Sequence, residues 1–354
     1  MREMSKAVMI GGLVVLLSSP VFGQSFSQSF EDGIEAFKGG DYVAAIESWK
    51  PVAEQGHAGA QYNLGLMYNL GKGEGQDYTK AIKWYRKAAE QGHARAQNNL
   101  GRMYDNGTGI ALNEIEAVKW YRKAAEQGEQ RAQYRLGLKY HRGEGTSQNY
   151  SEAAKWYRQS AEQGVANAQF SLGFLYEFGK GVSQSGNKAV KWYRKAAEQG
   201  QQKAQFNLAR MYDRGNIVPQ DFSEAVKWYL RAAEQGEIRS QVNLGRKYYS
   251  GKGIPQNFSE AIKWYRRAAE RGDPIAQLNL ASMYSSGEGV TRNLVLAYFF
   301  ANLSSSRGHQ ESFELRDTLI KKLSPEQIAE AQNMATSWKV GTPFPSKDDV
   351  TTWP

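Results

Sequence analysis

The chain has 354 residues, of which 41% are hydrophobic and 12% aromatic, a composition that excludes a disordered protein. It contains no cysteine, which excludes disulfides, thiol nucleophiles and metal sites built on cysteine. The formal net charge is +9 at pH 7, and helix-favouring residues are abundant while only 9 residues are proline. We therefore expect an all-α protein whose positive charge suits an acidic partner.

Residues 1–23 have the pattern of a bacterial signal peptide. Arg2 and Lys6 give a charged start, an apolar run extends from Ala7 to Leu17, and small residues precede Gly23. The apolar run is shorter than the roughly 20 residues that a membrane span needs, which argues against the alternative of a membrane anchor. We predict cleavage after Gly23, a periplasmic or secreted mature protein, and no membrane span after cleavage.

An internal repeat of 36 residues follows the signal sequence. Alanines recur at this spacing without insertion or deletion, at Ala45, Ala81, Ala117, Ala153, Ala189, Ala225, Ala261 and Ala297. We therefore assign an N-terminal capping helix to residues 24–44 and eight repeat units to residues 45–332, the last of them degenerate.

Each repeat unit is predicted to be a pair of helices. Residues 81–92 place Trp84 and Tyr85 on an apolar face at helical spacing, and Gly92 ends this first helix. A second helix follows in residues 93–104. Gly101 lies inside that helix, where glycine costs about 1 kcal/mol relative to alanine, so we infer that a neighbouring helix approaches too closely for a side chain.

The start of the next first helix carries a capping-box pattern, an N-cap residue followed three positions later by Glu. The pairs are Asn113 with Glu116, Asn149 with Glu152, Asp221 with Glu224, and Asn257 with Glu260. The fifth unit breaks the repeat, because residues 216–219 replace the Gly-x-Gly turn of the other units. We predict a local change of curvature or contact there.

The units must stack on one another. Ordering one unit costs on the order of 36 to 70 kcal/mol of backbone entropy, which a single hairpin does not recover. The prediction is a solenoid in which each unit contacts mainly the next. A closing helix is expected in residues 323–340, with Ser324 as N-cap and Pro325 as its first residue, followed by a flexible tail in residues 341–354.

The unit Ala-x-Lys-Trp-Tyr-Arg-Lys-Ala-Ala-Glu-Gln-Gly in residues 81–92, followed by Ala-Gln-x-Asn-Leu-Gly-x-Met-Tyr in residues 96–104, resembles the Sel1-like repeat, a relative of the tetratricopeptide repeat. The resemblance covers all eight units. It implies a right-handed α-solenoid of helix-turn-helix repeats that acts as an adaptor, often in bacterial envelopes. Residues 324–332 also resemble the C-terminal cap of exported members. Members linked to β-lactam binding or hydrolysis carry cysteine pairs, which this chain lacks.

The sequence offers no convincing catalytic or metal site. His57, His93 and His309 share one repeat column directly after a helix-ending glycine, which indicates a role in the fold. His141 is expected in a turn, exposed to solvent. The Trp column from Trp84 to Trp264 favours a buried core position over a sugar-stacking surface. We therefore predict a protein that is not an enzyme and that uses no cofactor or metal.

Basic residues are concentrated on the polar side of the first helices, in three columns that we call the basic stripe. Its members are Lys83, Lys119, Lys155, Lys191, Lys227 and Lys263; Arg86, Arg122, Arg158, Arg194 and Arg266; and Lys87, Lys123, Lys195, Arg231 and Arg267. One interpretation is a solvated face whose positive charge is partly offset by ion pairs such as Arg86 with Glu90. The other is a surface for an acidic partner.

Together these patterns predict an exported adaptor whose first helices line a concave face, with the basic stripe binding an acidic protein segment or envelope component. Nucleic acid is the usual partner of such a stripe in the cytoplasm, but export makes it an improbable one here, so we expect none. An anionic polysaccharide or the cell wall is the alternative partner. A hydrolase of β-lactams or cell-wall amides is a weaker alternative, because no nucleophile and base are paired in the sequence.

Overall fold

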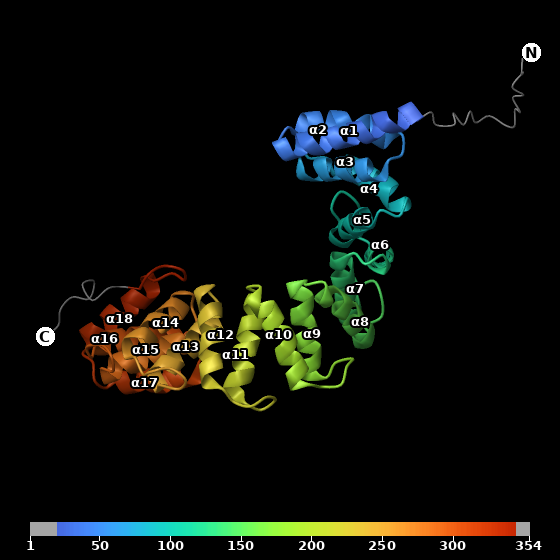
Figure 1. Cartoon of the computed structure of the whole chain (residues 1–354). Coiled ribbons are helices and arrows are strands. Elements are labelled where there is room, and N and C mark those ends of the chain that lie inside the picture. Colours follow the sequence, from blue (N-terminus) through green and yellow to red (C-terminus); the bar gives the residue numbers. More distant parts are fainter. Residues whose placement is uncertain (1–19, 345–354) are drawn as a thin grey trace, which may run out of the picture. The chain divides into compact units, whose positions relative to one another are not determined.

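The computed structural model describes residues 20–344, with side chains from residue 27, and every regular element in this range is an α-helix (Figure 1). The prediction of an all-α solenoid is therefore confirmed. The chain divides into two compact units, whose described parts are residues 20–149 and 150–344. Within each unit, consecutive helices pack against one another, as α1, α2 and α3 do in Figure 1.

The helices follow the 36-residue repeat. The first helices of the repeats are α2 (Tyr42–Glu54), α4 (Tyr78–Glu90), α6 (Glu114–Glu126), α8 (Tyr150–Glu162), α10 (Gly186–Glu198), α12 (Phe222–Glu234), α14 (Phe258–Glu270) and α16 (Leu294–Ser305). The second helices are α3 (Ala58–Leu70), α5 (Ala94–Asn106), α7 (Gln130–Arg142), α9 (Ala166–Phe178), α11 (Gln202–Arg214), α13 (Ile238–Ser250), α15 (Pro274–Ser286) and α17 (Gln310–Ile320). Two more helices flank them, α1 (Pro20–Gly39) and α18 (Pro325–Ser337).

Glycines and N-cap side chains set the helix ends. Gly92, which follows α4, has a φ of 89°, the left-handed conformation expected where the first helix ends. At the start of α6, the Asn113 side chain accepts from the backbone N–H of Glu116. The predicted reciprocal bond of a capping box is absent there, because the Asn113 N–H already donates to the Tyr104 carbonyl at 2.9 Å. Glu116 pairs with Lys119 instead.

A column of buried tyrosines packs against the glycines inside the second helices. A methyl group added at Gly101 would lie 2.8 Å from the Tyr121 ring, and one at Gly65 would lie 2.6 Å from the Tyr85 ring. Both distances are too short for carbon atoms that are not bonded to each other. The inference that Gly101 allows close helix contact is confirmed, and the neighbour is the next first helix.

Buried glutamines link successive repeats through hydrogen bonds. The Gln97 amide, which is 4% exposed, donates to the Ala89 carbonyl at 3.0 Å, and its oxygen accepts from Gln127 at 2.8 Å. The same arrangement recurs in the second unit, where Gln205 donates to Ala197 and accepts from Gln235. Each glutamine thereby satisfies one carbonyl at the end of a first helix and ties two repeats together.

Buried ion pairs also join neighbouring repeats. In the first unit Lys139, which is 4% exposed, pairs with Asp105 and lies 3.1 Å from Glu144. In the second unit Arg210 pairs with Glu177, and Lys247 pairs with Asp213. Each acidic residue also accepts a hydrogen bond from a buried tyrosine of the next first helix, namely Tyr121 to Asp105, Tyr193 to Glu177 and Tyr229 to Asp213.

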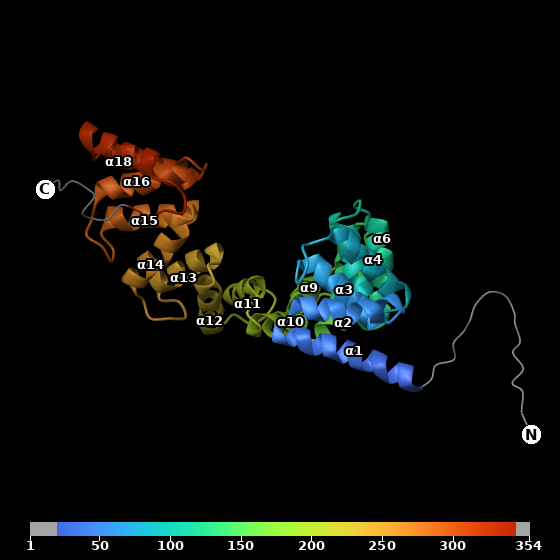
Figure 2. The same cartoon turned by 90° about the horizontal axis from the view of Figure 1, so that it is seen from above.

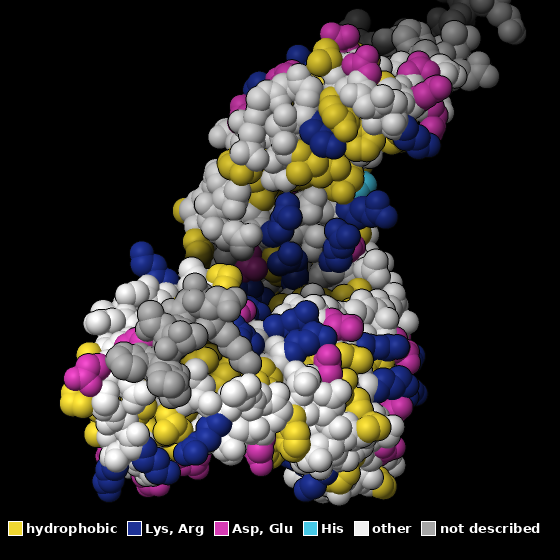
Figure 3. Space-filling view, turned by 90° about the vertical axis from the view of Figure 1, so that its left-hand side faces the viewer, with side chains coloured by type: hydrophobic (Ala, Val, Ile, Leu, Met, Phe, Trp, Pro, Cys, Tyr) yellow, Lys and Arg dark blue, Asp and Glu magenta, His cyan; other side chains and the backbone are white. Residues whose placement is uncertain are grey.

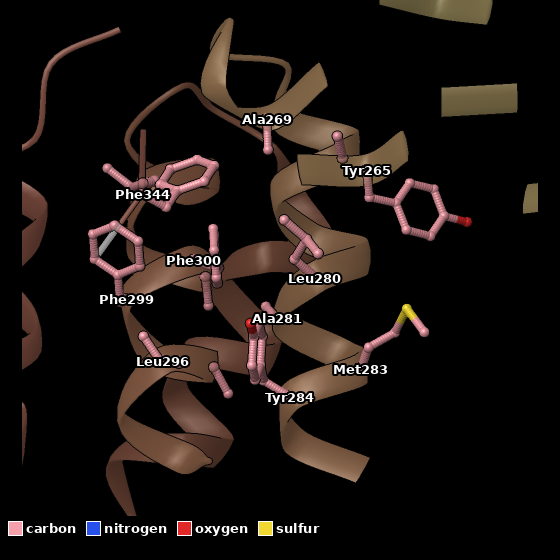
Figure 4. Packing of buried hydrophobic residues seen from close by; sticks show 14 of the residues in the cluster. Tyr265, Ala269, Leu280, Ala281, Met283, Tyr284, Leu296, Phe299, Phe300 and Phe344 are labelled. Atoms are coloured by element: carbon pink, nitrogen blue, oxygen red, sulfur yellow. The ribbon is translucent and has the colours of Figure 1, made fainter. Parts of the chain in front are cut away.

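The second unit ends in an aromatic cluster. Phe299 and Phe300 of α16 pack against Phe344, with ring centroids 5.8 and 4.8 Å away (Figure 4). Helix α18 lies beside α16 (Figure 2), and it begins at Pro325 with a full capping box between Ser324 and Gln327. This cluster covers the apolar face that α16 would otherwise leave exposed at the end of the repeats.

The tyrosine column predicts a sensitivity to alkaline pH. Burial raises the pKa of the phenols of Tyr85, Tyr121, Tyr193, Tyr229 and Tyr265. The unfolded chain loses these protons near pH 10. The contribution of these tyrosines to the free energy of unfolding is therefore fully present below about pH 10. It falls as the pH rises further, because the folded state must keep the protons that the unfolded chain loses.

We expect phenolate absorbance to show two groups of tyrosines. The tyrosines that solvent reaches will ionise first with circular dichroism unchanged, and the buried column will ionise at higher pH only as helix content is lost. Ionisation of all tyrosines in one step near pH 10, with the helices intact, would contradict the tight burial of the column.

Candidate interaction surface

The lysine column of the basic stripe is exposed on the first helices. In the first unit it comprises Lys83 of α4 and Lys119 of α6, and in the second unit Lys155, Lys191, Lys227 and Lys263 of α8, α10, α12 and α14. Lys119, Lys227 and Lys263 form ion pairs with the Glu three residues earlier. Their side chains remain 61, 49 and 51% exposed, so they stay accessible to a partner.

Lys83 and Lys191 have no acidic neighbour at that earlier position, which holds Lys80 and Lys188 instead. Neither of these stripe lysines lies within 4.0 Å of a carboxylate in the described part of the chain. The net positive charge along the stripe is therefore greatest on α4 and α10.

The arginine column has a role within the fold. The guanidinium groups of Arg86, Arg122, Arg158 and Arg194 donate to the tyrosine hydroxyl 18 residues later, at 2.9, 2.6, 2.9 and 2.7 Å. Each bond joins the first helix of a repeat to the last turns of its second helix. The expected pair between Arg86 and Glu90 is not formed, because the guanidinium is directed to Tyr104.

The third column covers the tryptophans. The cations of Lys87, Lys123 and Lys195 lie 4.7, 4.4 and 5.1 Å from the ring centroids of Trp84, Trp120 and Trp192, and Arg231 and Arg267 lie similarly over Trp228 and Trp264. Such cation–π contacts contribute roughly 0.5 to 1 kcal/mol at exposed sites. The lysine column also contacts tryptophans, because the cations of Lys155, Lys191, Lys227 and Lys263 lie 5.3, 5.8, 5.7 and 5.9 Å from the ring centroid of the Trp that follows each, but these distances are longer than those of the third column.

The tryptophan column belongs to the core, as the sequence favours. Trp84, Trp156 and Trp228 are 8, 6 and 1% exposed, so their faces are not open for stacking on a sugar ring. The sequence interpretation that set the core position above a sugar-binding surface is confirmed for these side chains.

Two histidines of the repeat column act as helix caps. The Nδ1 atoms of His57 and His93 accept from the backbone N–H of Ala60 and Ala96 at 3.1 and 3.2 Å, which confirms their role in the fold. Burial lowers the pKa of His93, which favours the neutral ring that this bond requires. The expectation for His141 is wrong, because it lies half-buried in the last turn of α7 rather than in a solvated turn.

Among the side chains of residues 27–344, no three or more His, Asp or Glu lie together in a position to hold a metal ion. In the same range, no helix is both long and apolar enough to cross a membrane.

Paired helices repeated along a chain, each pair contacting the next within its unit, define an α-solenoid of the helical-hairpin class. Seven consecutive matches to the Sel1 repeat cover residues 58–93, 94–129, 130–165, 166–201, 202–237, 238–273 and 274–309. The chain belongs to the Sel1 repeat family. Each match begins with a second helix and ends with the next first helix, which is a different phase of the same 36-residue period.

Two solved structures are similar to this chain. One is a protective antigen with an SLR fold present in uropathogenic Escherichia coli strains, 32% identical, with a TM-score of 0.60, covering 88% of this chain and 76% of that one. The other is a Sel1 repeat protein from Oxalobacter formigenes, 39% identical, with a TM-score of 0.60, covering 68% of this chain and 96% of that one. A comparison with curated protein sequences gave no match.

Sel1 repeat proteins generally act as scaffolds that bind protein partners. The fold is typical of a scaffold without catalytic function.

Proposed function

We propose that this protein is an exported scaffold that binds an acidic segment of a partner protein through the lysine column of the basic stripe. The observation that carries the proposal is the exposure of Lys83, Lys119, Lys155, Lys191, Lys227 and Lys263 at the same repeat position. The other two columns contact tyrosines and tryptophans at shorter distances, whereas the lysines remain exposed even where their cations lie 5.3 to 5.9 Å from a Trp ring centroid.

Repetition makes a weak contact effective. One exposed ion pair contributes about 0.2 to 1 kcal/mol. The second unit repeats the lysine on four consecutive first helices, so a partner with a matching row of carboxylates gains several such contacts at once. The regular recurrence of the lysines favours a partner with an acidic helix or strand. The concavity of the face stays a prediction.

Export is supported by the charged start, the short apolar run and the small residues before Gly23. A structural relative is a protective antigen of uropathogenic strains, which is compatible with a place in the cell envelope. Residues 1–19 lie outside the described part of the chain, so the signal sequence is argued from the sequence alone.

Photo-crosslinking in intact cells tests both halves of the proposal. A photoreactive amino acid at Lys191 should yield an adduct with an acidic protein, and the crosslinked chain should begin at Gln24. The matched control carries the same group at Lys203, an exposed lysine of α11 outside the stripe, and should yield little adduct. Equal adducts from both positions, or a cytosolic chain beginning at Met1, would contradict the proposal.

A further inference from the structure

The first unit contains an apolar cavity on a different surface from the basic stripe. Its volume is about 520 Å³, and it is lined by α1, α2, α3 and the start of α5. Phe30, Ile34, Phe37, Tyr62 and Leu66 contribute side chains that are only half-buried. In Figure 3, hydrophobic side chains gather on the part of this unit that contains α1 to α3, with Lys and Arg beside them.

The first repeat departs from the later ones at a position that lines the cavity. Gly59 lies on its wall, whereas the equivalent positions of the later repeats hold Arg95, Arg131, Asn167, Lys203, Arg239, Ile275 and Glu311. In the second unit the Arg239 guanidinium lies 4.0 Å from the centroid of the Phe206 ring, a contact whose repeat equivalents here are Arg95 and Tyr62, which both line the cavity. Gly59 therefore leaves the wall near α1 without the side chain that each later repeat carries at this position.

The cavity has a charge preference. Two cations, Lys38 and Arg95, line it, and no carboxylate does. Both are exposed, and neither forms an ion pair within the described residues. His93 adds a polar group, stacked on Tyr62 with centroids 4.7 Å apart; because its Nδ1 accepts a bond, its neutral ring carries the proton on Nε2. An apolar floor with cationic edges fits an apolar group attached to a carboxylate.

We propose that this cavity binds a peptide segment of a partner protein that carries an aromatic side chain within two residues of a carboxylate. The aromatic group lies on Phe37, Tyr62 and Leu66, and the carboxylate meets Lys38 and Arg95. A peptide fits better than a small metabolite, because the half-buried walls would leave a small ligand exposed, whereas enclosed sites bury most of their ligand. The site lies outside the basic stripe and is independent of it.

The test uses the full-length mature chain with methyl-labelled Leu and Met, and three synthetic peptides that differ at two positions. The first has a Trp-Glu core, the second Trp-Gln and the third Ala-Glu. Binding of the Trp-Glu peptide should shift the methyl signals of Leu66 and Met67 and leave Leu280 of the second unit unchanged. The Trp-Gln and Ala-Glu peptides should each bind at least fivefold more weakly.

Three variants, two that fill the cavity and one that removes its cations, separate the cavity from simple charge attraction. Gly59→Arg fills the cavity while adding positive charge, and should weaken the Trp-Glu peptide at least tenfold. A methyl group at Gly59 would lie 3.2 Å from Phe30, so a second filling variant without this close contact is needed. Leu66→Arg serves for this, because Arg102, Arg210 and Arg246 occupy its repeat position. Lys38→Gln with Arg95→Gln should weaken the Trp-Glu peptide and leave the Trp-Gln peptide unaffected.

The proposal is overturned if no peptide shifts Leu66 and Met67, if Trp-Gln binds as tightly as Trp-Glu, or if the two filling variants bind as tightly as the original chain.

Discussion

Replacing Arg210 with methionine will lower the free energy of unfolding of the second unit by about 3 kcal/mol, because it leaves a buried carboxylate without its cation. Glu177 is 1% exposed and pairs with Arg210 of the next second helix, 33 residues later. The hydrogen bond from the Tyr193 hydroxyl at 2.8 Å remains, but a neutral donor compensates a buried charge only in part. The measurement is chemical denaturation followed by circular dichroism.

The chain provides a matched control at the same repeat position. Arg246 is exposed and forms no ion pair within the described residues, because Asp213, its counterpart, pairs with Lys247. Arg246→Met should therefore change stability by less than about 0.5 kcal/mol. Adding Glu177→Gln to Arg210→Met should recover a large part of the loss, because the buried charge is then gone. A loss in Arg210→Met no greater than in Arg246→Met would show that the Glu177 pair is not a buried charge interaction.

Replacing Gly186 with tyrosine will destabilise the second unit by about 2 to 3 kcal/mol, although tyrosine is the most frequent residue at this position. Tyr42, Tyr78 and Tyr150 hold the equivalent place, at the start of a first helix. A methyl group added at Gly186 would lie 2.5 Å from both the Ile217 side chain and its carbonyl oxygen. The other repeats place glycine opposite: a methyl group added at Gly253 would lie 2.7 Å from the Cβ atom of Phe222.

The sequence predicted a change of contact in the fifth unit, and the structure shows what it is. A small residue, Gly186, takes the place of a large one, and a large residue, Ile217, takes the place of glycine. Ile217→Gly alone should cost about 1 to 2 kcal/mol through lost apolar contact and added chain entropy. In the double variant, Gly186→Tyr and Ile217→Gly should cost less than the sum of the single changes by at least about 1 kcal/mol. Asn187→Tyr at the exposed neighbouring position is the control and should be nearly neutral. Additive losses would contradict the exchange.

Periodicity was sufficient to predict much of the fold. The apolar face containing Trp84 and Tyr85, the end of the helix at Gly92 and the close contact at Gly101 each follow from a residue type at a helical position. These features are local, or they depend only on the size of a side chain. The role of His93 in the fold followed from its place in the repeat, directly after that glycine.

Contacts between columns were not predictable from the period alone. The repeat shows that Arg86 and Tyr104 recur, but only the helix crossing shows that they meet. The same holds for Gln97 with Gln127, and for Glu177 with Arg210. A signal existed in the sequence, because acidic residues at the position of Asp105 are followed one repeat later by a buried Lys or by Arg210. Gly186 was likewise an exception in its column. Because it has no side chain, there is room for the side chain of Ile217.

The central claim is that the exposed lysine column binds an acidic partner. Once crosslinking has identified the partner, its affinity is to be measured for the native chain and for two charge-matched variants of the second unit. The stripe variant reverses Lys155, Lys191, Lys227 and Lys263 to Glu; the control variant reverses Lys203, Arg214, Arg246 and Lys252, which are exposed outside the stripe. The arginine column is left intact because its bonds to tyrosines support the fold.

Reversing four cations should weaken binding at low salt by at least a hundredfold, because each lost contact of about 0.2 to 1 kcal/mol is replaced by repulsion. The control variant should bind within about threefold of the native chain, although it has the same net charge as the stripe variant. Salt should weaken the native complex, since the Debye length falls to about 3 Å at 1 M. If the stripe variant folds and binds as tightly as the control variant, the basic stripe is only a solvated surface.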